Sequence, residues 1–309
     1  MEIEQSTNAI VMIRPHRFHP NPETAADNAF QQAIAEGEMP AVSTAAQREF
    51  DDAVETLRAA GVTVHVVDDT ATPEKPDAVF PNNWFSTHHD GRIALYPMYS
   101  AARRRERRHD LIDELRKNYR ITDVVDYSLC EEQGQCLEGT GSLVLDHVNK
   151  IAYASLSHRT HPEVLKRFCD DFGYEPVTFR SQSADGRPVY HTNVVMCVGT
   201  DFAIFGTGMI PDEADRVGVQ NLLEATSKEV IDVTPAQISE FAGNAIELHD
   251  EAGKKLLVLS ARAAASLTNA QRVTIERYAR LVPLSLPTIE LAGGSARCMI
   301  ATVHLPRVA

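Results

Sequence analysis

Short apolar runs alternate with polar turns along most of the chain. An apolar run at 9–14 predicts a first strand, a helical pattern at 43–60 ends at Gly61, and a second strand follows at 62–67. Beyond this point the runs come in pairs, separated by turns such as His89-Asp90-Gly91, and this pattern predicts β-hairpins. The predicted hairpins are 83–87 with 92–96, 141–145 with 150–154, 192–198 with 202–205, and 244–248 with 255–259.

Most of these hairpins are followed by a helix and then by another strand. The predicted helices are 101–119, 161–172, 212–227 and 268–280, and the strands after them are 121–127, 175–179, 230–233 and 282–284. The hairpins recur roughly every 50 to 60 residues, a period typical of a circular or stacked array of one supersecondary unit. About five ββαβ units account for nearly the whole chain, and no long Pro/Gly/Ser-rich linker divides it. We therefore predict an α/β protein with a single domain over residues 1–309.

A closed ring of such units would bring the starts of its hairpins together at a central axis. Asn83, His191 and Cys298 lie far apart in the sequence, but each lies at or near the start of a predicted hairpin or of the last strand. The repeat therefore predicts that these side chains share one site.

The last apolar stretch presents the most reactive side chain in this set. Gly293, Gly294 and Ser295 allow close approach of the backbone, and Cys298 follows them at the start of an alternating apolar run that ends before Pro306. A thiol at the end of a strand is a candidate nucleophile. The alternative is that Cys298 is a small core residue, as most free cysteines are.

Composition narrows the choice of partners. The 309 residues are 43% hydrophobic, enough for a substantial core, and the formal net charge of −13 opposes binding to nucleic acid or to an anionic membrane. One basic run, residues 103–108, is interpreted as a solvated helix face. No apolar run is long enough to span a bilayer, and the N-terminus lacks the pattern of a signal peptide.

The five cysteines are odd in number and irregularly spaced, which fits a reducing, cytoplasmic location. Cys130 and Cys136 lack the spacing and the nearby histidines of a zinc site, and Cys197 lies in an apolar run typical of a core. We expect neither a metal nor a cofactor. The oligomeric state stays open, with a homo-oligomer as one option.

Four ordered motifs resemble one enzyme superfamily. They are Leu137-Glu138-Gly139-Thr140-Gly141, Ser157-His158-Arg159-Thr160, His191-Thr192-Asn193 and the segment 293–299. Together they resemble the guanidine-modifying penteins (arginine deiminase, dimethylarginine dimethylaminohydrolase and the amidinotransferases), and most of all the citrulline-utilisation hydrolases. The likeness runs from about residue 77 to the C-terminus. It implies a pentein fold, a five-bladed propeller of ββαβ units with pseudo-fivefold symmetry, which agrees with the repeat.

The resemblance implies a role for each motif residue. Cys298 would attack the trigonal carbon of a guanidino or ureido group and form a covalent intermediate. His191 would protonate the departing amine and then activate water, and Glu138 would bind substrate nitrogens and keep His191 protonated. Arg159 would bind the α-carboxylate of a small amino-acid substrate. Taken singly, His191 could instead be a structural histidine, Glu138 a surface residue, and Arg159 a partner of Glu163.

Two departures from the superfamily pattern indicate the substrate. Enzymes of this type that act on arginine carry aspartates where this chain has Asn83 and Asn193, while Asp77 keeps its acid. A buried guanidinium facing two asparagines would lack its counter-charges, whereas a neutral ureido group offers both donors and an acceptor to an amide. The resemblance therefore points to citrulline, with Asp77, Asn83, Arg159 and Asn193 as substrate-binding residues.

The predicted reaction is hydrolysis of the ureido C–N bond of citrulline to ornithine, carbon dioxide and ammonia. The alternatives are deimination, dimethylargininase or amidinotransferase chemistry on a guanidino substrate, and, from another class, a non-catalytic binding pentein. The run Glu138-Gly139-Thr140-Gly141 lacks the final acid of the usual E-G-G-D motif, which leaves contacts to the amino-acid end of the substrate open. Arg103 or Arg104 is a weaker candidate for a second carboxylate contact.

Overall fold

The computed structural model describes residues 3–183 and 185–308, and their strands form five three-stranded sheets. In every sheet the middle strand is antiparallel to one neighbour and parallel to the other. The sheets are β15 (Ala301–Thr302), β1 (Ala9–Arg14) and β2 (Thr63–Asp68); β3 (Phe85–Thr87), β4 (Arg92–Leu95) and β5 (Asp123–Asp126); β6 (Val144–Asp146), β7 (Ile151–Ser155) and β8 (Glu175–Phe179); β9 (Met196–Val198), β10 (Phe202–Phe205) and β11 (Glu229–Asp232); and β12 (Ile246–His249), β13 (Lys255–Ser260) and β14 (Arg280–Leu284).

Helices connect the two parallel strands of each sheet. They are α1 (Met39–Ala59), α2 (Ala101–Arg104) with α3 (His109–Leu115), α5 (Pro162–Phe172), α7 (Glu213–Ala225), and α9 (Ala261–Ser266) with α10 (Asn269–Glu276). Three short helices, α4 (Gly139–Ser142), α6 (Thr192–Val195) and α8 (Pro235–Ser239), and 3₁₀ turns at Glu36–Glu38, Pro81–Asn83, Ser128–Gln133, Thr207–Met209 and Ile289–Ala292 complete the structure. The α/β class and the repeated three-stranded unit are confirmed.

Local sequence accounts for where these helices begin and end. In α5, Pro162 stands in the first turn, His161 accepts a hydrogen bond from the backbone N–H of Glu163, and Gly173 ends the helix at a φ of 70°. Its buried face consists of Val164, Leu165, Phe168, Cys169 and Phe172. In α10, Thr268 and Gln271 form a capping box.

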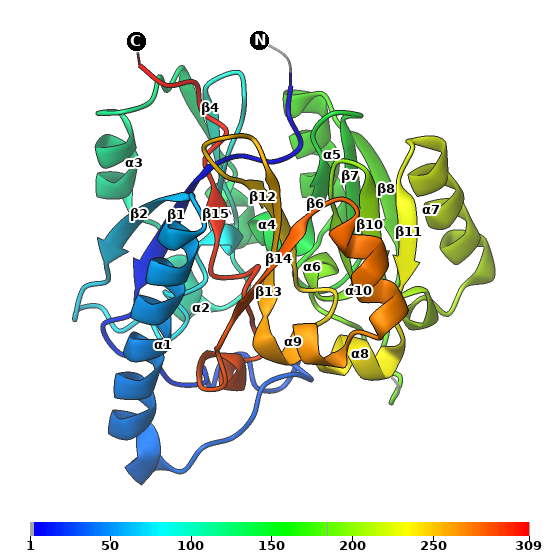
Figure 1. Ribbon diagram of the computed structural model, residues 1–309. Helices are drawn as coiled ribbons and strands as arrows, with labels where there is room; N and C mark the ends of the chain where they lie inside the picture. Colours follow the sequence, from blue (N-terminus) through cyan, green and yellow to red (C-terminus); the bar gives the residue numbers. More distant parts are fainter. Residues whose placement is uncertain (1–2, 184, 309) are drawn as a thin grey trace.

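The first strands of the repeats, β3, β6, β9, β12 and β15, are called here the inner strands. β15 contacts β3, β6 contacts β9, β9 contacts β12, and α4 lies against β3. Figure 1 shows α1, α3, α7 and α10 at the periphery, with β6, β12, β15, α4 and α6 between them. The segments before the inner strands therefore lie close together, as the repeat predicts. Within the described residues, hydrogen bonds do not join the five sheets into one closed sheet.

The predicted first and last strands meet in one sheet. β15 comes from the C-terminal end of the chain and pairs antiparallel with β1, which pairs in parallel with β2. Cys298 lies in the turn three residues before β15. The predicted strand there is much shorter than its apolar run, because only Ala301 and Thr302 are paired.

The basic run at 103–108 was interpreted as one solvated helix face, and this is wrong for Arg103. The helix breaks between α2 and α3, and the side chains of Arg103 and Glu106 are buried, paired by two hydrogen bonds of 3.0 Å. Arg104 remains partly exposed and donates to the carbonyl of Met98. Burial of a charge-paired arginine competes with continuation of the helix, which the periodicity of the sequence does not reveal.

None of the helices in the described part of the chain combines the length and the apolar character that a bilayer span requires.

Candidate active site

Cys298 is buried in its turn and contacted by two asparagine amides. The Nδ2 of Asn244 lies 3.3 Å from its Sγ, and the Nδ2 of Asn193 lies 3.6 Å from it. Asn244 is itself held in place, since its Nδ2 donates to the carbonyl of Asn193 and its Oδ1 accepts the backbone N–H of Arg297. Both asparagines thus direct an amide N–H donor at the sulfur.

Asn244 was not singled out from the sequence as a site residue. The available signal was its place in the repeat, because Asn83, Asn193 and Asn244 all lie near the start of a predicted hairpin. Only the first two stand in motifs that resemble the superfamily, so motif comparison passed over the third.

His191 and Glu138 form a buried pair, with 2.8 Å between Nε2 and Oε2. Glu138 is fully buried, so it is not a surface residue. Its Oε1 accepts the backbone N–H of Tyr99, and its Oε2 lies 3.5 Å from Arg159 and 3.9 Å from Arg103. Burial opposes the charge of Glu138, but Arg159, His191 and Arg103 together outweigh it and lower the pKa of this carboxyl.

The expectation that Glu138 keeps His191 protonated is wrong for this closed structure. Burial lowers the pKa of His191 to about 4, although the hydrogen bond and charge of Glu138 act in the opposite direction. Arg159 and Arg103 also disfavour the imidazolium. His191 is therefore neutral at pH 7, and because an ionised carboxylate only accepts hydrogen bonds, Nε2 carries the proton and Nδ1 is the basic nitrogen.

Arg159 is buried and already paired. Its guanidinium donates to both carboxylate oxygens of Asp27 at 3.1 and 2.7 Å, and it lies over the ring of Tyr190 at 4.6 Å. Its partners are Asp27 and Glu138, whereas Glu163, the alternative partner considered from sequence, accepts from Gln135. The group expected to bind a substrate carboxylate is thus occupied by a carboxylate of the chain itself.

Asp77 and Asn83 both lie next to Arg103. The Nη1 of Arg103 donates to the Oδ1 of Asn83 at 2.9 Å, and its Nε lies 3.7 Å from Asp77. Asn21 also donates to Asp77 at 2.9 Å. Burial raises the pKa of Asp77, with Arg103 and Asn21 opposing it. Arg103 therefore belongs to the site.

Two glycines of the Glu138-Gly139-Thr140-Gly141 run allow these groups to approach one another. Gly139 has a φ of 46°, and a Cβ there would clash with the carbonyl oxygen of Asn82. A Cβ on Gly141 would clash with the Nδ2 of Asn83 and would lie 2.7 Å from the Nδ1 of His191. The position that carries an acid in the usual motif therefore has no room for a side chain here.

One small cavity joins these residues, and we call it the active-site cavity. Its volume is about 20 Å³, and its lining includes Asp77, Asn83, Arg159, His191 and Cys298, together with Thr24 and Asn28 of the N-terminal segment. Asn193 reaches it through Cys298, and Glu138 through His191. All seven residues selected from the sequence therefore gather at one place. The volume suffices for about one water molecule, so an amino acid can enter only if lining residues move.

Comparison with solved structures identifies related folds. ArgZ, an arginine dihydrolase from the ornithine-ammonia cycle in cyanobacteria, superimposes with a TM-score of 0.74 at 16% identity over 97% of this chain and 41% of ArgZ. Its N-terminal domain, bound to product, gives 0.75 at 16% identity over 99% of both chains. The dimethylarginine hydrolase DDAH of Pseudomonas aeruginosa, complexed with citrulline, gives 0.66 at 13% identity over 96% of this chain and 99% of that one.

This chain thus corresponds to the N-terminal domain of ArgZ and spans less than half of the full-length protein. At these identities the likeness establishes the fold. No curated protein sequence matches the chain. The family model for eukaryotic N,N dimethylarginine dimethylhydrolase matches residues 14–305. The chain therefore belongs to the N,N dimethylarginine dimethylhydrolase family, within the pentein superfamily.

Proposed function

We propose that the protein is a cysteine-dependent hydrolase that cleaves the ureido C–N bond of citrulline or of a close ureido amino acid. The observation that carries this proposal is the pair of neutral amides in the active site. Asn193 lies beside the thiol of Cys298, and Asn83 lies between Arg103 and the backbone of Glu138. The proposal includes the arrangement of the five sheets as blades of a five-bladed propeller, with the inner strands around its axis.

The amides favour a neutral substrate group. Asn83 has both ends of its amide engaged, since its Oδ1 accepts from Arg103 and its Nδ2 donates to the carbonyl of Glu138 at 3.4 Å. A guanidinium at this place would find amides where a counter-charge is needed, at a cost of several kcal/mol. A ureido group carries no charge, and its carbonyl oxygen can accept from an amide N–H.

The reaction begins with the proton of the nucleophile. As the ureido group displaces water, neutral His191 takes the proton of Cys298, and the thiolate attacks the ureido carbon. The tetrahedral adduct expels the side-chain amine of ornithine, which receives its proton from His191, and a carbamoyl thioester remains on Cys298. Glu138 stabilises the transient imidazolium through its hydrogen bond to Nε2.

Water completes the cycle. His191, neutral again, takes a proton from water as the oxygen attacks the thioester carbon, and the thiolate leaves and recovers that proton. Carbamate departs and decomposes to ammonia and carbon dioxide. The described residues thus supply the nucleophile, the proton carrier and the charge stabilisation.

Substrate entry requires an exchange of partners at Arg159. We expect the α-carboxylate of the substrate to replace Asp27 on the guanidinium, because the bidentate geometry suits either carboxylate. Asp27 belongs to the segment that also contributes Thr24 and Asn28 to the cavity wall, so its departure would open the cavity.

A guanidino substrate is the second candidate, and the family match favours it. The model that matches residues 14–305 describes hydrolases of dimethylarginine, and Asp77 and Glu138 are carboxylates that could face a guanidinium. In that case the thiolate would expel dimethylamine or ammonia, and the amidino adduct on Cys298 would still carry the amino-acid side chain, unlike the carbamoyl adduct.

Mass spectrometry of acid-quenched enzyme separates the two candidates. Wild-type protein is mixed separately with L-citrulline, L-arginine and dimethylarginine, quenched within the first turnover, and digested. We expect a carbamoyl group on Cys298 with citrulline and unmodified protein with the other two. An amidino group from arginine or dimethylarginine, with none from citrulline, would overturn the proposal.

A further inference from the structure

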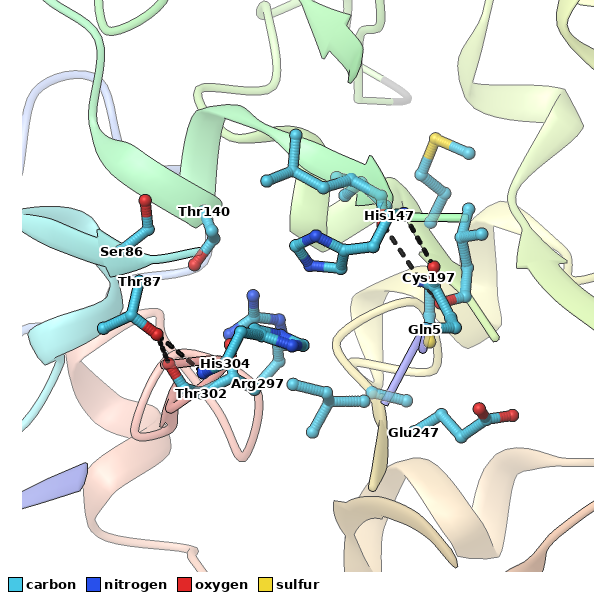
Figure 2. Close-up of a pocket in the computed structure, with 16 residues that line it drawn as sticks. Gln5, Ser86, Thr87, Thr140, His147, Cys197, Glu247, Arg297, Thr302 and His304 are labelled. Atoms are coloured by element: carbon cyan, nitrogen blue, oxygen red, sulfur yellow. Dashed lines mark hydrogen bonds between the residues drawn. The ribbon is translucent and has the colours of Figure 1, made fainter. Parts of the chain in front are cut away.

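A second cavity lies between the inner strands, and residues 297 and 298 of the chain face different cavities. Cys298 lines the active-site cavity, whereas Arg297 lines this one, whose volume is about 50 Å³. Figure 2 shows it with side chains from several inner strands around it. The polar and charged residues of its wall include Gln5, Thr87, His147, Glu247, Arg297 and His304.

Gln5 closes one part of this wall. Its Nε2 donates to the carbonyls of Leu145 and Val198 at 2.9 and 3.0 Å, and its Oε1 accepts the backbone N–H of His147 at 2.8 Å. The amide of Gln5 thus bridges the strands β6 and β9 and is fully engaged. Gln5 therefore shapes the wall of the cavity, and other side chains must bind any molecule inside it.

Arg297 brings a positive charge into this cavity without a carboxylate partner among the described residues. Its Nη1 donates to the carbonyl of Ile300 at 2.8 Å, and the groups that favour its charge are the thiols of Cys298 and Cys197. Burial accordingly lowers the pKa of Arg297. A guanidinium has five N–H donors, so most of its hydrogen-bonding capacity remains for an occupant of the cavity.

Neutral histidine rings lie beside the same cavity and add hydrogen-bonding nitrogens to it. The rings of His147 and His304 lie 4.2 Å apart, and that of His89 lies 4.7 Å from His304. His304 is buried, and its Nδ1 has no hydrogen-bond partner among the described residues. Burial holds the pKa of both His147 and His304 well below the usual value, and neighbouring histidines and Arg297 reinforce the effect. Buried polar nitrogens without partners normally indicate a bound water or ion.

The one carboxylate in the wall is already satisfied. Glu247 accepts hydrogen bonds from both the backbone N–H and the hydroxyl of Thr200. In Figure 2 its carboxylate points away from Arg297 and His304. A cation is disfavoured by Arg297, and no group of three His, Cys, Asp or Glu side chains in residues 3–183 and 185–308 is arranged to hold a metal.

We propose that this second cavity is a binding site for a small inorganic anion, held by the guanidinium of Arg297 and by His304. The volume admits chloride or bicarbonate and excludes a large organic anion. The anion supplies the counter-charge that Arg297 lacks and accepts a hydrogen bond from the unpartnered Nδ1 of His304, in the tautomer that carries a proton there.

The site is linked to the nucleophile through one residue. The backbone N–H of Arg297 donates to the Oδ1 of Asn244, and the Nδ2 of Asn244 contacts the Sγ of Cys298. Binding of an anion to Arg297 therefore acts on the turn that carries Cys298. Two anions of this size are available. Chloride comes from the medium, and bicarbonate forms from carbon dioxide.

Bromide reports the site directly. A crystal of the wild-type protein is soaked in bromide, and anomalous scattering locates the ion. In parallel, the melting temperature is measured in bromide, chloride, bicarbonate and gluconate at constant ionic strength. We expect an anomalous peak beside Arg297 and His304, and a melting temperature that rises to saturation with the small anions but not with gluconate. Tighter binding of bicarbonate than of chloride would assign the carbon dioxide product as the source, and the reverse order would assign the medium.

Arg297→Gln is expected to weaken anion binding by roughly tenfold or more, because the charge-assisted hydrogen bonds are lost. Arg187→Gln, which removes an exposed arginine paired with Asp185, serves as the matched control and should keep the response. If Arg297→Gln fails to fold, the bromide crystal of the wild type decides alone. Water in the cavity, with no anomalous peak and with the same melting temperature in all four anions, would overturn the proposal. Because none of these measurements needs turnover, they are independent of the proposed reaction.

Discussion

The active-site cavity and the second cavity differ in how their charged groups are balanced. In the active-site cavity the arginines have carboxylate partners, Arg159 with Asp27 and Arg103 with Glu106, and neutral His191 is hydrogen-bonded to Glu138. In the second cavity Arg297 has no carboxylate partner within residues 3–183 and 185–308, and the Nδ1 of neutral His304 has no hydrogen-bond partner there. Paired charges can bind a zwitterion by exchanging partners, whereas an unpaired guanidinium requires an added anion. The same arrangement of strands thus provides two kinds of site.

Glu138→Gln should break the pairing in the active-site cavity most severely. The change removes the negative charge that stabilises the imidazolium of His191, and it leaves Arg159 and Arg103 short of a counter-charge. We expect kcat to fall by about 10²- to 10⁴-fold, and the free energy of unfolding to fall by about 3 kcal/mol. Steady-state kinetics and denaturant unfolding measure the two effects. Glu114→Gln, at an exposed position, is the control, and a kcat equal to wild type in Glu138→Gln would contradict the assignment.

Asn193→Asp should shift the substrate preference away from a neutral group and toward a cationic one. A carboxylate beside Cys298 disfavours the thiolate unless a cationic group compensates it. We therefore expect kcat/KM to fall for citrulline and to rise for arginine, whose guanidinium supplies that cation. A change of about 3 kcal/mol corresponds to a shift of roughly 100-fold in the ratio of kcat/KM for citrulline to that for arginine. Competition between the two substrates gives this ratio. The exposed variant Asn118→Asp is the control. If both variants keep the wild-type ratio, Asn193 does not determine substrate specificity.

The unfolding free energy at low pH should depend on His304, which is buried in the wall of the second cavity. Burial lowers the pKa of His304, so its contribution to stability is complete above the unfolded pKa of about 6.5 and is lost as pH falls below it. Each histidine of this kind adds a slope of about 1.4 kcal/mol per pH unit to the unfolding free energy. We expect His304→Asn to reduce the slope between pH 6.5 and 5 by about one proton, measured at constant chloride. His16→Asn, at an exposed position, should keep the wild-type slope, and an equal slope in both variants would contradict the account.

Asp27→Asn should have the smallest effect. The Asp27–Arg159 pair is partly exposed on the Asp27 side, so it contributes about 1 kcal/mol. Without this internal competitor we expect KM for citrulline to fall by about fivefold, with kcat unchanged. Initial-rate kinetics test this, with Asp185→Asn as a control that removes an exposed ion pair elsewhere. A rise in KM would indicate that Asp27 itself contacts the substrate.

The fold was largely predictable because period and alternation are local properties. The strands at 9–14, 175–179 and 202–205 were predicted with their observed bounds, and the repeat placed His191 and Cys298 together. The one-turn helix α6 and the last two residues of α4 were predicted as the starts of strands instead. They lie where close approach of backbone and side chain, as at Gly141, overrides β-propensity.

The site was predictable in its members but not in its electrostatics. Motifs selected Cys298, His191 and Glu138, yet the neutral state of His191 depends on burial, which a sequence does not show. Asp27 stands in a long irregular segment without a motif, and its contact with Arg159 spans 132 positions. Arg103 was set aside as part of a charged run, because its burial follows from the break between α2 and α3.

The central claim is that the enzyme acts on a neutral ureido group, and competition tests it most directly. Wild-type protein and Cys298→Ala are incubated with equal concentrations of L-citrulline and L-arginine that carry different isotopic labels, and each product is quantified. We predict that wild type converts citrulline to ornithine with at least roughly 100-fold preference over arginine, and that Cys298→Ala forms no product. Preferential consumption of arginine by the wild type would contradict the account of Asn83 and Asn193.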